Sequence, residues 1–361
     1  GNGATGGTNT ALGYAALYEN TASDNTAVGG QAMYANTTGS DNVAVGSNAL
    51  DANTTGNYNV AIGKDALTNS TTAVENTAIG YQAMDTATTA HNCIAIGSHS
   101  LDDLTTGVGN IGIGRYALAD ITDGTGCTAI GAYDGSAQPA LRNNTGNSNT
   151  AIGSGALSAN TTASFNSAVG YMALGSNSTG QLNNALGYQA LTTNTTGAQN
   201  TAVGHQALYA NTTADNNTAM GYDALEDNTT GANNTAIGAQ ALKDNTVGDR
   251  NVAVGHEALY TNTTGKRIVA VGQGAFRTMN ITDSSSTYST AVGYQCGYSN
   301  TTGVRNTALG GYTFYYNTTG NDNVALGVSA MEASTTASRM VVIGKDAAYK
   351  YNHSSGNQVF I

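Results

Sequence analysis

A glycine closes a short apolar triplet about every 17 residues along almost the whole chain. Twenty of these anchor glycines occur, from Gly13 to Gly344, and 16 of the 19 intervals between them have this same length. The shared unit reads N-T-A-[IVL]-G-x-x-A-L-x-x-N-T-T-G-x-x. A fixed period of this length is typical of solenoids, in which each coil buries its apolar residues only by stacking on its neighbours. The period therefore predicts an all-β parallel β-solenoid or β-roll of about 20 coils, in a single repeat domain spanning residues 1–361.

The composition agrees with a repetitive β fold and argues against several other classes of protein. Charged residues make up only 10% of the chain, which contains 47 Gly, one Pro and no Trp. This composition lacks the long Leu-, Glu- and Lys-rich stretches of a helix bundle, and so little Pro argues against a disordered linker. The formal net charge of −11 would repel nucleic-acid phosphates and anionic lipids. No apolar run approaches the roughly 20 residues that span a bilayer, so we expect neither nucleic-acid binding nor a membrane span in this segment.

The three residues before each anchor glycine predict a short strand. The last of them is aliphatic or Met in all 20 copies, the middle one is Ala in 18, and the first is Thr in 10 and Val or Ile in 8. Alternate residues of a strand share a face, so we expect the aliphatic and β-branched residues to form the core face. The other face accepts little beyond Ala and is expected to press against another backbone layer. This predicts a homotrimer or another tight parallel homo-oligomer.

The rest of the unit predicts a second strand, a turn and a ladder. The A-L segment is too short for two helical turns and is expected to form a second short strand. The N-T-T-G segment is expected to supply Asn and Gly for the left-handed positions of a tight turn. Asn also stands four residues before the anchor in 15 copies, from Asn9 to Asn323. This column predicts a hydrogen-bonded amide ladder like those of cross-β stacks.

The strand element resembles that of a known adhesin family. N-T-A-[IV]-G, as at 25–29 and 234–238, is similar to the repeat of the YadA-like heads of trimeric autotransporter adhesins, which are left-handed parallel β-rolls assembled as trimers. The longer N-T-A-I-G-x-x-A-L-x-x-N-T-T-G unit looks still more like repeats of phage and bacterial tail-fibre proteins. The adhesin heads use a shorter repeat than this chain does. The resemblance implies a β-roll, a homotrimer and a role in attachment.

Residues that could carry catalytic or metal chemistry are scattered. His205 and His256 follow anchor glycines three coils apart, roughly 14 Å, too far to share a metal ion, and are expected to be solvated. Cys93 and Cys127 share a column about 10 Å apart, beyond the reach of a disulfide. Cys296 replaces a packed Ala, and we expect three buried thiols. No Ser/His/Asp order, Walker loop or zinc signature occurs, so we expect no enzyme activity, no cofactor and no bound metal.

Candidate sites of modification and recognition lie in the turns. Sequons in the N-T-T-G column are candidate glycosylation sites, although turn chemistry alone also explains them: Asn36, Asn53, Asn194, Asn228, Asn262 and Asn317. Tyr recurs at the first or fifth position after the anchor, as at Tyr188 and Tyr209. A stripe of exposed Tyr would bind sugars, or else the rings pack between subunits or over coil edges.

Two long intervals insert loops near residues 132–148 and 277–289. Insertions in repeat proteins map to loops and often to the binding face; the alternative is that these insertions are neutral. The candidate recognition residues in these loops are Tyr133, Asp134, Gln138, Arg142, Arg277, Asp283 and Tyr288.

These features predict a structural, elongated extracellular or virion fibre, a shaft or head that mediates attachment to a surface or host. Its partners would be further copies of itself and a surface glycan or host receptor. Residues 357–361 begin another repeat, so we expect an interior piece of a longer fibre. Alternatives are a lattice- or glycan-binding solenoid, such as an ice-binding protein, and a self-polymerising extracellular filament subunit. Ice binding is disfavoured because adjacent Thr residues in the turn would point to opposite faces.

Overall fold

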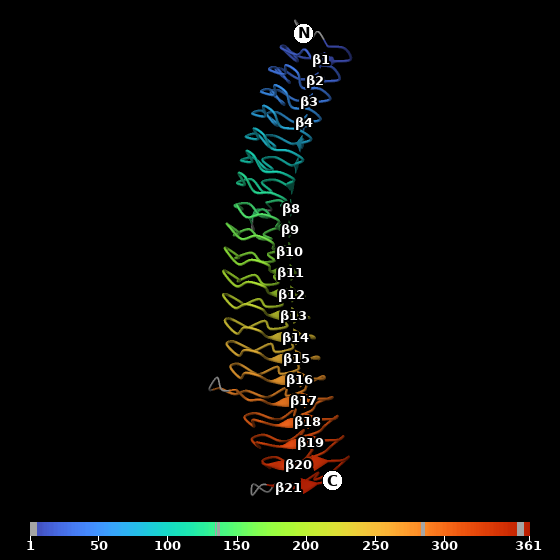
Figure 1. The fold of residues 1–361 in the computed structure, drawn as a ribbon, viewed down its shortest axis with the longest axis vertical. Coiled ribbons are helices and arrows are strands. Elements are labelled where there is room, and N and C mark those ends of the chain that lie inside the picture. The colour runs from blue at the N-terminus through green and yellow to red at the C-terminus, as the bar shows by residue number, and fades with distance from the viewer. Residues whose placement is uncertain (1–5, 134, 136–137, 283–285, 352–356) are drawn as a thin grey trace. The chain divides into compact units, whose positions relative to one another are not determined.

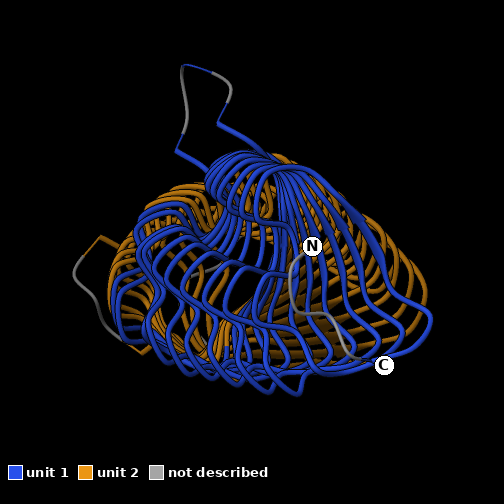
Figure 2. Cartoon of the chain, turned by 90° about the horizontal axis from the view of Figure 1, so that it is seen from above, with its two compact units in different colours: residues 1–182 blue, residues 183–361 orange. Residues whose placement is uncertain are grey.

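The computed structural model describes residues 6–133, 135, 138–282, 286–351 and 357–361 (Figure 1). These residues form short parallel strands joined by turns and contain no helix, so no described helix could cross a membrane. The chain divides into two compact units, unit 1 with residues 1–182 and unit 2 with residues 183–361 (Figure 2). Within each unit the coils are stacked, which confirms the all-β solenoid built on the repeat. The single domain and the homotrimer stay predictions.

Each strand of unit 1 pairs in parallel with the strands of the coils before and after it within the unit. The register follows the repeat, and Ala129 still lies opposite Ala151 across the first insertion. The described strands are β1 (Thr10–Leu12), β2 (Thr26–Val28), β3 (Val43–Val45), β4 (Val60–Ile62), β5 (Thr77–Ile79), β6 (Ile94–Ile96), β7 (Ile111–Ile113), β8 (Thr128–Ile130), β9 (Thr150–Ile152) and β10 (Ser167–Val169).

Unit 2 repeats the same parallel ladder. Ala270 lies opposite Ala291 across the second insertion, so the extra residues leave the strands in register. The described strands are β11 (Asn184–Leu186), β12 (Thr201–Val203), β13 (Thr218–Met220), β14 (Thr235–Ile237), β15 (Val252–Val254), β16 (Val269–Val271), β17 (Thr290–Val292), β18 (Thr307–Leu309), β19 (Val324–Leu326), β20 (Met340–Ile343) and β21 (Gln358–Phe360).

The strands turn Ala, and not the aliphatic residue, toward the interior. The middle residue is buried in every strand from β2 to β19, whereas the residues on either side are half-buried or exposed. The predicted core face is therefore wrong. The layer that presses on Ala belongs to the same chain: a Cβ atom added to Gly112, which takes the Ala position, would lie 2.6 Å from the Ser100 Oγ and 3.2 Å from the Leu101 Cγ. The interior is already filled by the A-L segment, so only a methyl group fits opposite it.

The A-L segment supplies the large core side chains, but as turns and not as the expected second strand. Leu208 is fully buried, and its N–H donates to the carbonyl of Ala224 in the next coil at 3.0 Å. The second and fourth residues after the anchor are left-handed, with φ of 52° at Gln206 and 54° at Leu208. A left-handed residue other than glycine costs about 1–2 kcal/mol, which bonding to the next coil offsets.

Two ladders of buried Asn run through the coils, and the predicted ladder before the strands is confirmed. Asn217 accepts from the backbone N–H of Asn234 at 2.9 Å and donates to the Gly231 carbonyl at 2.9 Å. A second ladder follows the N-T-T-G column, where the Nδ2 of Asn211 donates to the Asn194 Oδ1 at 2.8 Å. These bonds satisfy polar groups that the narrow coil would otherwise bury unpaired.

The anchor glycines occupy backbone that no side chain could share. Gly204 has φ 136°, and a Cβ atom there would lie 2.3 Å from the carbonyl oxygen of Gly221. By contrast, the Asn and Gly of N-T-T-G do not take the left-handed positions expected of them. Gly39 is needed for space instead, because its Cβ would lie 2.3 Å from the Gly56 oxygen and 2.6 Å from the Asn36 Oδ1.

Candidate binding surfaces

The outer face of the strands is an uncharged surface in both units. Because Ala points inward, the aliphatic residue and the Thr, Val or Ile two positions earlier both point outward. Leu186 is 51% exposed, Met220 43% and Ile237 39%. From β2 to β20, no Asp, Glu, Lys or Arg stands among the described strand residues. We call this surface the strand face. An extended uncharged surface with an aliphatic column is a candidate contact surface for another molecule.

His205 lies between two tyrosine rings of unit 2. Its ring centroid is 5.1 Å from that of Tyr188 and 5.1 Å from that of Tyr222, with interplanar angles of 15° and 18°. The three residues follow successive anchor glycines, so the coil spacing itself stacks the rings. The His205 Nδ1 lies 3.6 Å from the Oδ1 of Asp223, and the His205 side chain is 42% exposed. His205 is therefore solvated at its edge, as expected, and packed on both faces. His256 is exposed.

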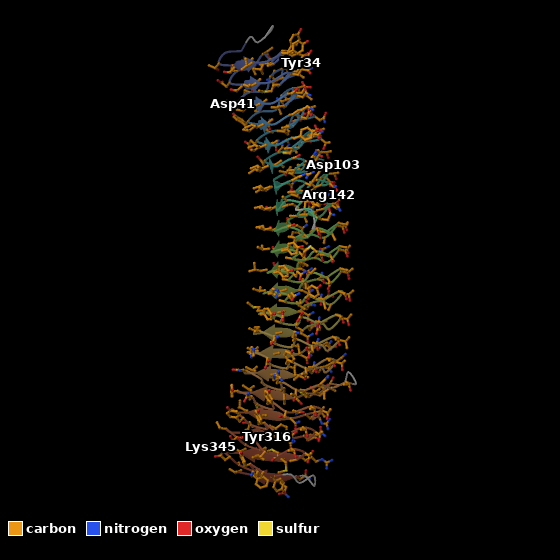
Figure 3. All side chains as sticks on the ribbon, turned by 180° about the vertical axis from the view of Figure 1, so that it is seen from behind. Tyr34, Asp41, Asp103, Arg142, Tyr316 and Lys345 are labelled. Carbon is orange, nitrogen blue, oxygen red and sulfur yellow. The ribbon has the colours of Figure 1, made fainter. Side chains whose placement is uncertain are left out.

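A related cluster lies in unit 1 around His99. The His99 Nδ1 is 2.9 Å from the Oδ2 of Asp102, and the His99 ring stacks on Tyr116 with centroids 5.0 Å apart. The guanidinium groups of Arg115 and Arg142 lie 4.9 Å and 5.5 Å from the Tyr116 centroid. Figure 3 labels Arg142 at the edge of the coils. His205 covers one ring face of Tyr188 and one of Tyr222, which reduces the aromatic surface that these tyrosines offer to a sugar.

The structure separates the candidate recognition residues into two groups. Arg142 binds Asp120 through its Nε at 3.1 Å, and Arg277 binds Glu257 at 2.7 Å, so both hold neighbouring coils together. The hydrogen bond from Arg277 lowers the pKa of the Glu257 carboxyl group. In contrast, three of the residues are exposed: Tyr133, Gln138 and Tyr288. Asp134 and Asp283 lie outside the described residues. Figure 2 shows the described parts of both insertions leaving the coils.

The candidate glycosylation sites lie inside the coils. All six side chains are fully buried: Asn36, Asn53, Asn194, Asn228, Asn262 and Asn317. The Nδ2 of Asn53, for example, donates to the Asn36 Oδ1 at 2.8 Å and to the Gly56 carbonyl at 3.1 Å. A glycan on this nitrogen would break the ladder and has no room within the folded coil. The sequon match therefore reflects the ladder chemistry of the repeat.

The three cysteines are free and buried, as expected. Cys93 and Cys127 replace Asn in the ladder, and the backbone N–H of Asn110 donates to the Cys93 Sγ at 3.4 Å. Burial raises the pKa of all three thiols, that of Cys296 to about 12. These thiols stay protonated near neutral pH and are poor nucleophiles.

No group of three or more His, Cys, Asp or Glu side chains that could hold a metal ion occurs among the described residues. Acidic side chains do gather in unit 1, where burial and the neighbouring Asp102 raise the pKa of Asp85 and Asp103. The repeat could have revealed the histidine stacks, because Tyr188, His205 and Tyr222 occupy one column of the alignment.

The comparisons with known proteins add no family to this geometry. No protein-family model matches the chain, and no curated protein matches it either. The surfaces themselves therefore carry the functional argument.

Proposed function

We propose that this chain is a structural segment of an extracellular or virion fibre, in which further copies of the chain cover the strand face. The continuous, uncharged strand face is the observation that carries the proposal. The resemblance of the N-T-A-[IV]-G element to trimeric adhesin heads favours three copies. The assembled fibre would attach to a surface glycan or a host receptor.

The size of the strand face supports this proposal. A three-residue strand covers about 10 Å along its length, and coils repeat every 4.8 Å, so each strand contributes about 48 Å². The ten strands of unit 1 then provide about 480 Å² and the eleven of unit 2 about 530 Å². A stable protein interface needs about 800 Å² from each partner. Neither unit alone reaches this area, so a stable contact would need strands of both units.

Lysine on the strand face tests the assembly. Val203 and Ile237 point outward from β12 and β14, so V203K and I237K together should leave each coil folded but place charges in the contact. In sedimentation equilibrium at about 500 mM salt, where exposed charge pairs are screened, we expect a threefold mass for the wild-type chain and a single-chain mass for the variant. T213K with T230K, in exposed turns of the same unit, is the matched control. A wild-type chain of single mass, or a variant that keeps the threefold mass, would contradict the proposal.

Attachment is tested separately at the exposed insertion residues. Tyr133 and Tyr288 are 42% and 62% exposed, and an exposed aromatic ring can stack on a sugar. Alanine at both positions should weaken binding to a glycan array or to host cells without changing the oligomeric mass. Unchanged binding of this variant would show that the insertions are not the attachment site.

One observation favours the ice-binding alternative. Thr201, Thr218 and Thr235 stand in register on three successive strands and share the outer face with an aliphatic column. Val or Ile replaces this Thr in 8 of the 20 copies, so the column favours apolar contact over an array of hydroxyl groups. Inhibition of ice recrystallisation by the wild-type chain, lost on Thr218→Leu, would support ice binding over the fibre.

A further inference from the structure

The two units differ strongly in charge. Unit 1 contains 12 acidic and 3 basic residues, a net charge of −9, and unit 2 contains 11 acidic and 9 basic residues, a net charge of −2. The difference is concentrated in one column of the repeat, the residue five positions before each anchor glycine. We call this the corner column. It leads into the buried Asn before the strand, and its residues are mostly exposed.

The corner column carries opposite charges in the two units. Ahead of β2 to β5 in unit 1, four successive coils present Asp24, Asp41, Tyr58 and Glu75. Ahead of β15 to β18 in unit 2, four successive coils present Arg250, Arg267, Tyr288 and Arg305. Each stretch therefore reads charge, charge, Tyr, charge, with the sign reversed. All eight side chains are exposed.

The acidic stretch has no cationic partner within its own chain among the described residues. Asp24 accepts from the Thr8 hydroxyl group, and Asp41 accepts from the Ser40 hydroxyl at 2.8 Å. Figure 3 shows Asp41 at the edge of unit 1 opposite to Tyr34 and Asp103.

Local acids neutralise the basic stretch only in part. Arg250 and Lys266 each lie 3.0 Å from a carboxylate oxygen of Asp249, and Arg305 binds Asp322 through its Nε at 2.5 Å and its Nη2 at 3.1 Å. The Arg250 and Arg305 side chains are still 55% and 56% exposed. The basic side chains of this edge are Arg250, Lys266, Arg267, Arg305 and Arg339, against the two acids Asp249 and Asp322. The edge keeps a net charge of +3, which matches the −3 of Asp24, Asp41 and Glu75.

We propose that two copies of this chain lie side by side and parallel, with the acidic corner of one against the basic corner of the other. Both corners repeat at the same coil spacing of about 4.8 Å, so a parallel pair brings Asp24 to Arg250, Asp41 to Arg267 and Glu75 to Arg305. Tyr58 then meets Tyr288. An antiparallel pair would set Tyr58 against Arg267 and Asp41 against Tyr288, which leaves two charges unmatched.

This contact staggers the copies, because β2 of one chain lies level with β15 of the next. The pair then keeps one free basic corner on the first chain and one free acidic corner on the second. A contact between two different surfaces of the same chain therefore adds further copies without closing. The inference does not rest on the strand face, and the predicted assembly is an open filament, unlike a closed trimer.

Charge reversal with complementation tests the proposal. The basic-corner variant is R250E, R267E and R305E, and the acidic-corner variant is D24R, D41R and E75R. Each replacement is a residue type that this column already holds, as at Glu75 and Arg305. By light scattering at about 50 mM salt we expect wild-type filaments that dissolve at about 500 mM salt, because screening removes exposed charge pairs. For each variant alone, the association constant for self-association should fall at least about tenfold.

An equimolar mixture of the two variants should restore association, because the all-acidic corners of one variant then face the all-basic corners of the other. Starting from −11 and changing by 6, the variants have net charges of −17 and −5, so attraction between the whole molecules cannot explain the recovery. The triple variant K64E, K243E and K345E lowers the net charge by the same amount as the basic-corner variant, but away from the corner column. It should associate as the wild type does.

A mixture that stays unassociated would overturn the proposal, as would an equal loss in the triple lysine variant. So would salt-sensitive binding of the wild type to alginate, an acidic polysaccharide, lost in the basic-corner variant while self-association is unchanged. Repeating the mixture with V203K and I237K in both chains separates this contact from the strand face. Filament growth there would support the corner contact independently of the trimer. A single-chain mass of the wild type at high salt would contradict the trimer.

Discussion

At the residue scale, the hydrogen bonds of the buried asparagines fix how each coil stacks on the next. Asn217 receives one hydrogen bond from the next coil and donates to a carbonyl group of the turn, all within a closed interior. Leaving such groups unpaired costs more than the bonds themselves contribute. The left-handed Leu and Gln positions are tolerated because neighbouring coils hold their backbone.

Asn217→Ala tests this account. The change leaves the Asn234 N–H without its partner, whereas the Gly231 carbonyl keeps the hydrogen bond from the Asn228 Nδ2 at 3.0 Å. We therefore expect the free energy of unfolding to fall by about 1–3 kcal/mol. Amide hydrogen exchange at Asn234 should accelerate accordingly. Thr213→Ala, at an exposed turn position one coil earlier, should change stability by less than about 0.5 kcal/mol. Equal effects of the two substitutions would show that the ladder contributes little.

At the element scale, the segment packed behind a three-residue strand determines which side of the strand faces the interior. The A-L segment fills the interior with Leu and leaves room for a methyl group only, so the small residue of the triplet points inward. The large aliphatic residue is therefore free to contact another molecule.

A pair of adjacent substitutions on β12 tests which side faces inward. Ala202 is fully buried, so Ala202→Leu should overpack its own coil and cost about 1–3 kcal/mol. Val203→Leu, on the outer face, should be nearly neutral for the stability of the isolated chain. Thermal unfolding above the salt concentration that dissolves filaments measures both. A larger loss from Val203→Leu would reverse the assignment of the two faces.

At the scale of the whole molecule, each coil contacts mainly its two neighbours. The insertions confirm that this order is local, because strands on either side of them keep their register. Stability in such a stack is close to a sum over coils and the interfaces between neighbouring coils.

Deleting one full repeat should therefore preserve the fold. Removal of residues 205–221 joins two equivalent positions, so we expect the β signal in circular dichroism to persist with a modest loss of stability. Removal of residues 205–212 breaks the alignment of both Asn ladders and should produce local unfolding, detected as new proteolytic cleavage between β12 and β14. If the two deletion variants resisted protease equally, the alignment of equivalent positions in neighbouring coils would not be what holds the stack together.

Much of this protein follows from the sequence alone. The anchor glycines, the strand positions, the ladder before each strand and the buried thiols are all readable from an alignment of the repeats, because every copy meets the same local constraint. The histidine stacks and the reversed charges of the corner column are also present in that alignment, as columns that only need to be read across coils.

The direction of the strand faces was decided only by the tertiary structure. A triplet such as Thr201–Val203 alternates equally well with either side inward, and hydrophobicity favours burying the valine. The turns of the A-L segment occupy the space behind the strand, and the conformation of those turns depends on left-handed residues that no local propensity favours. The small residue is buried and the large one exposed because volume, and not hydrophobicity, limits the interior of a coil this narrow.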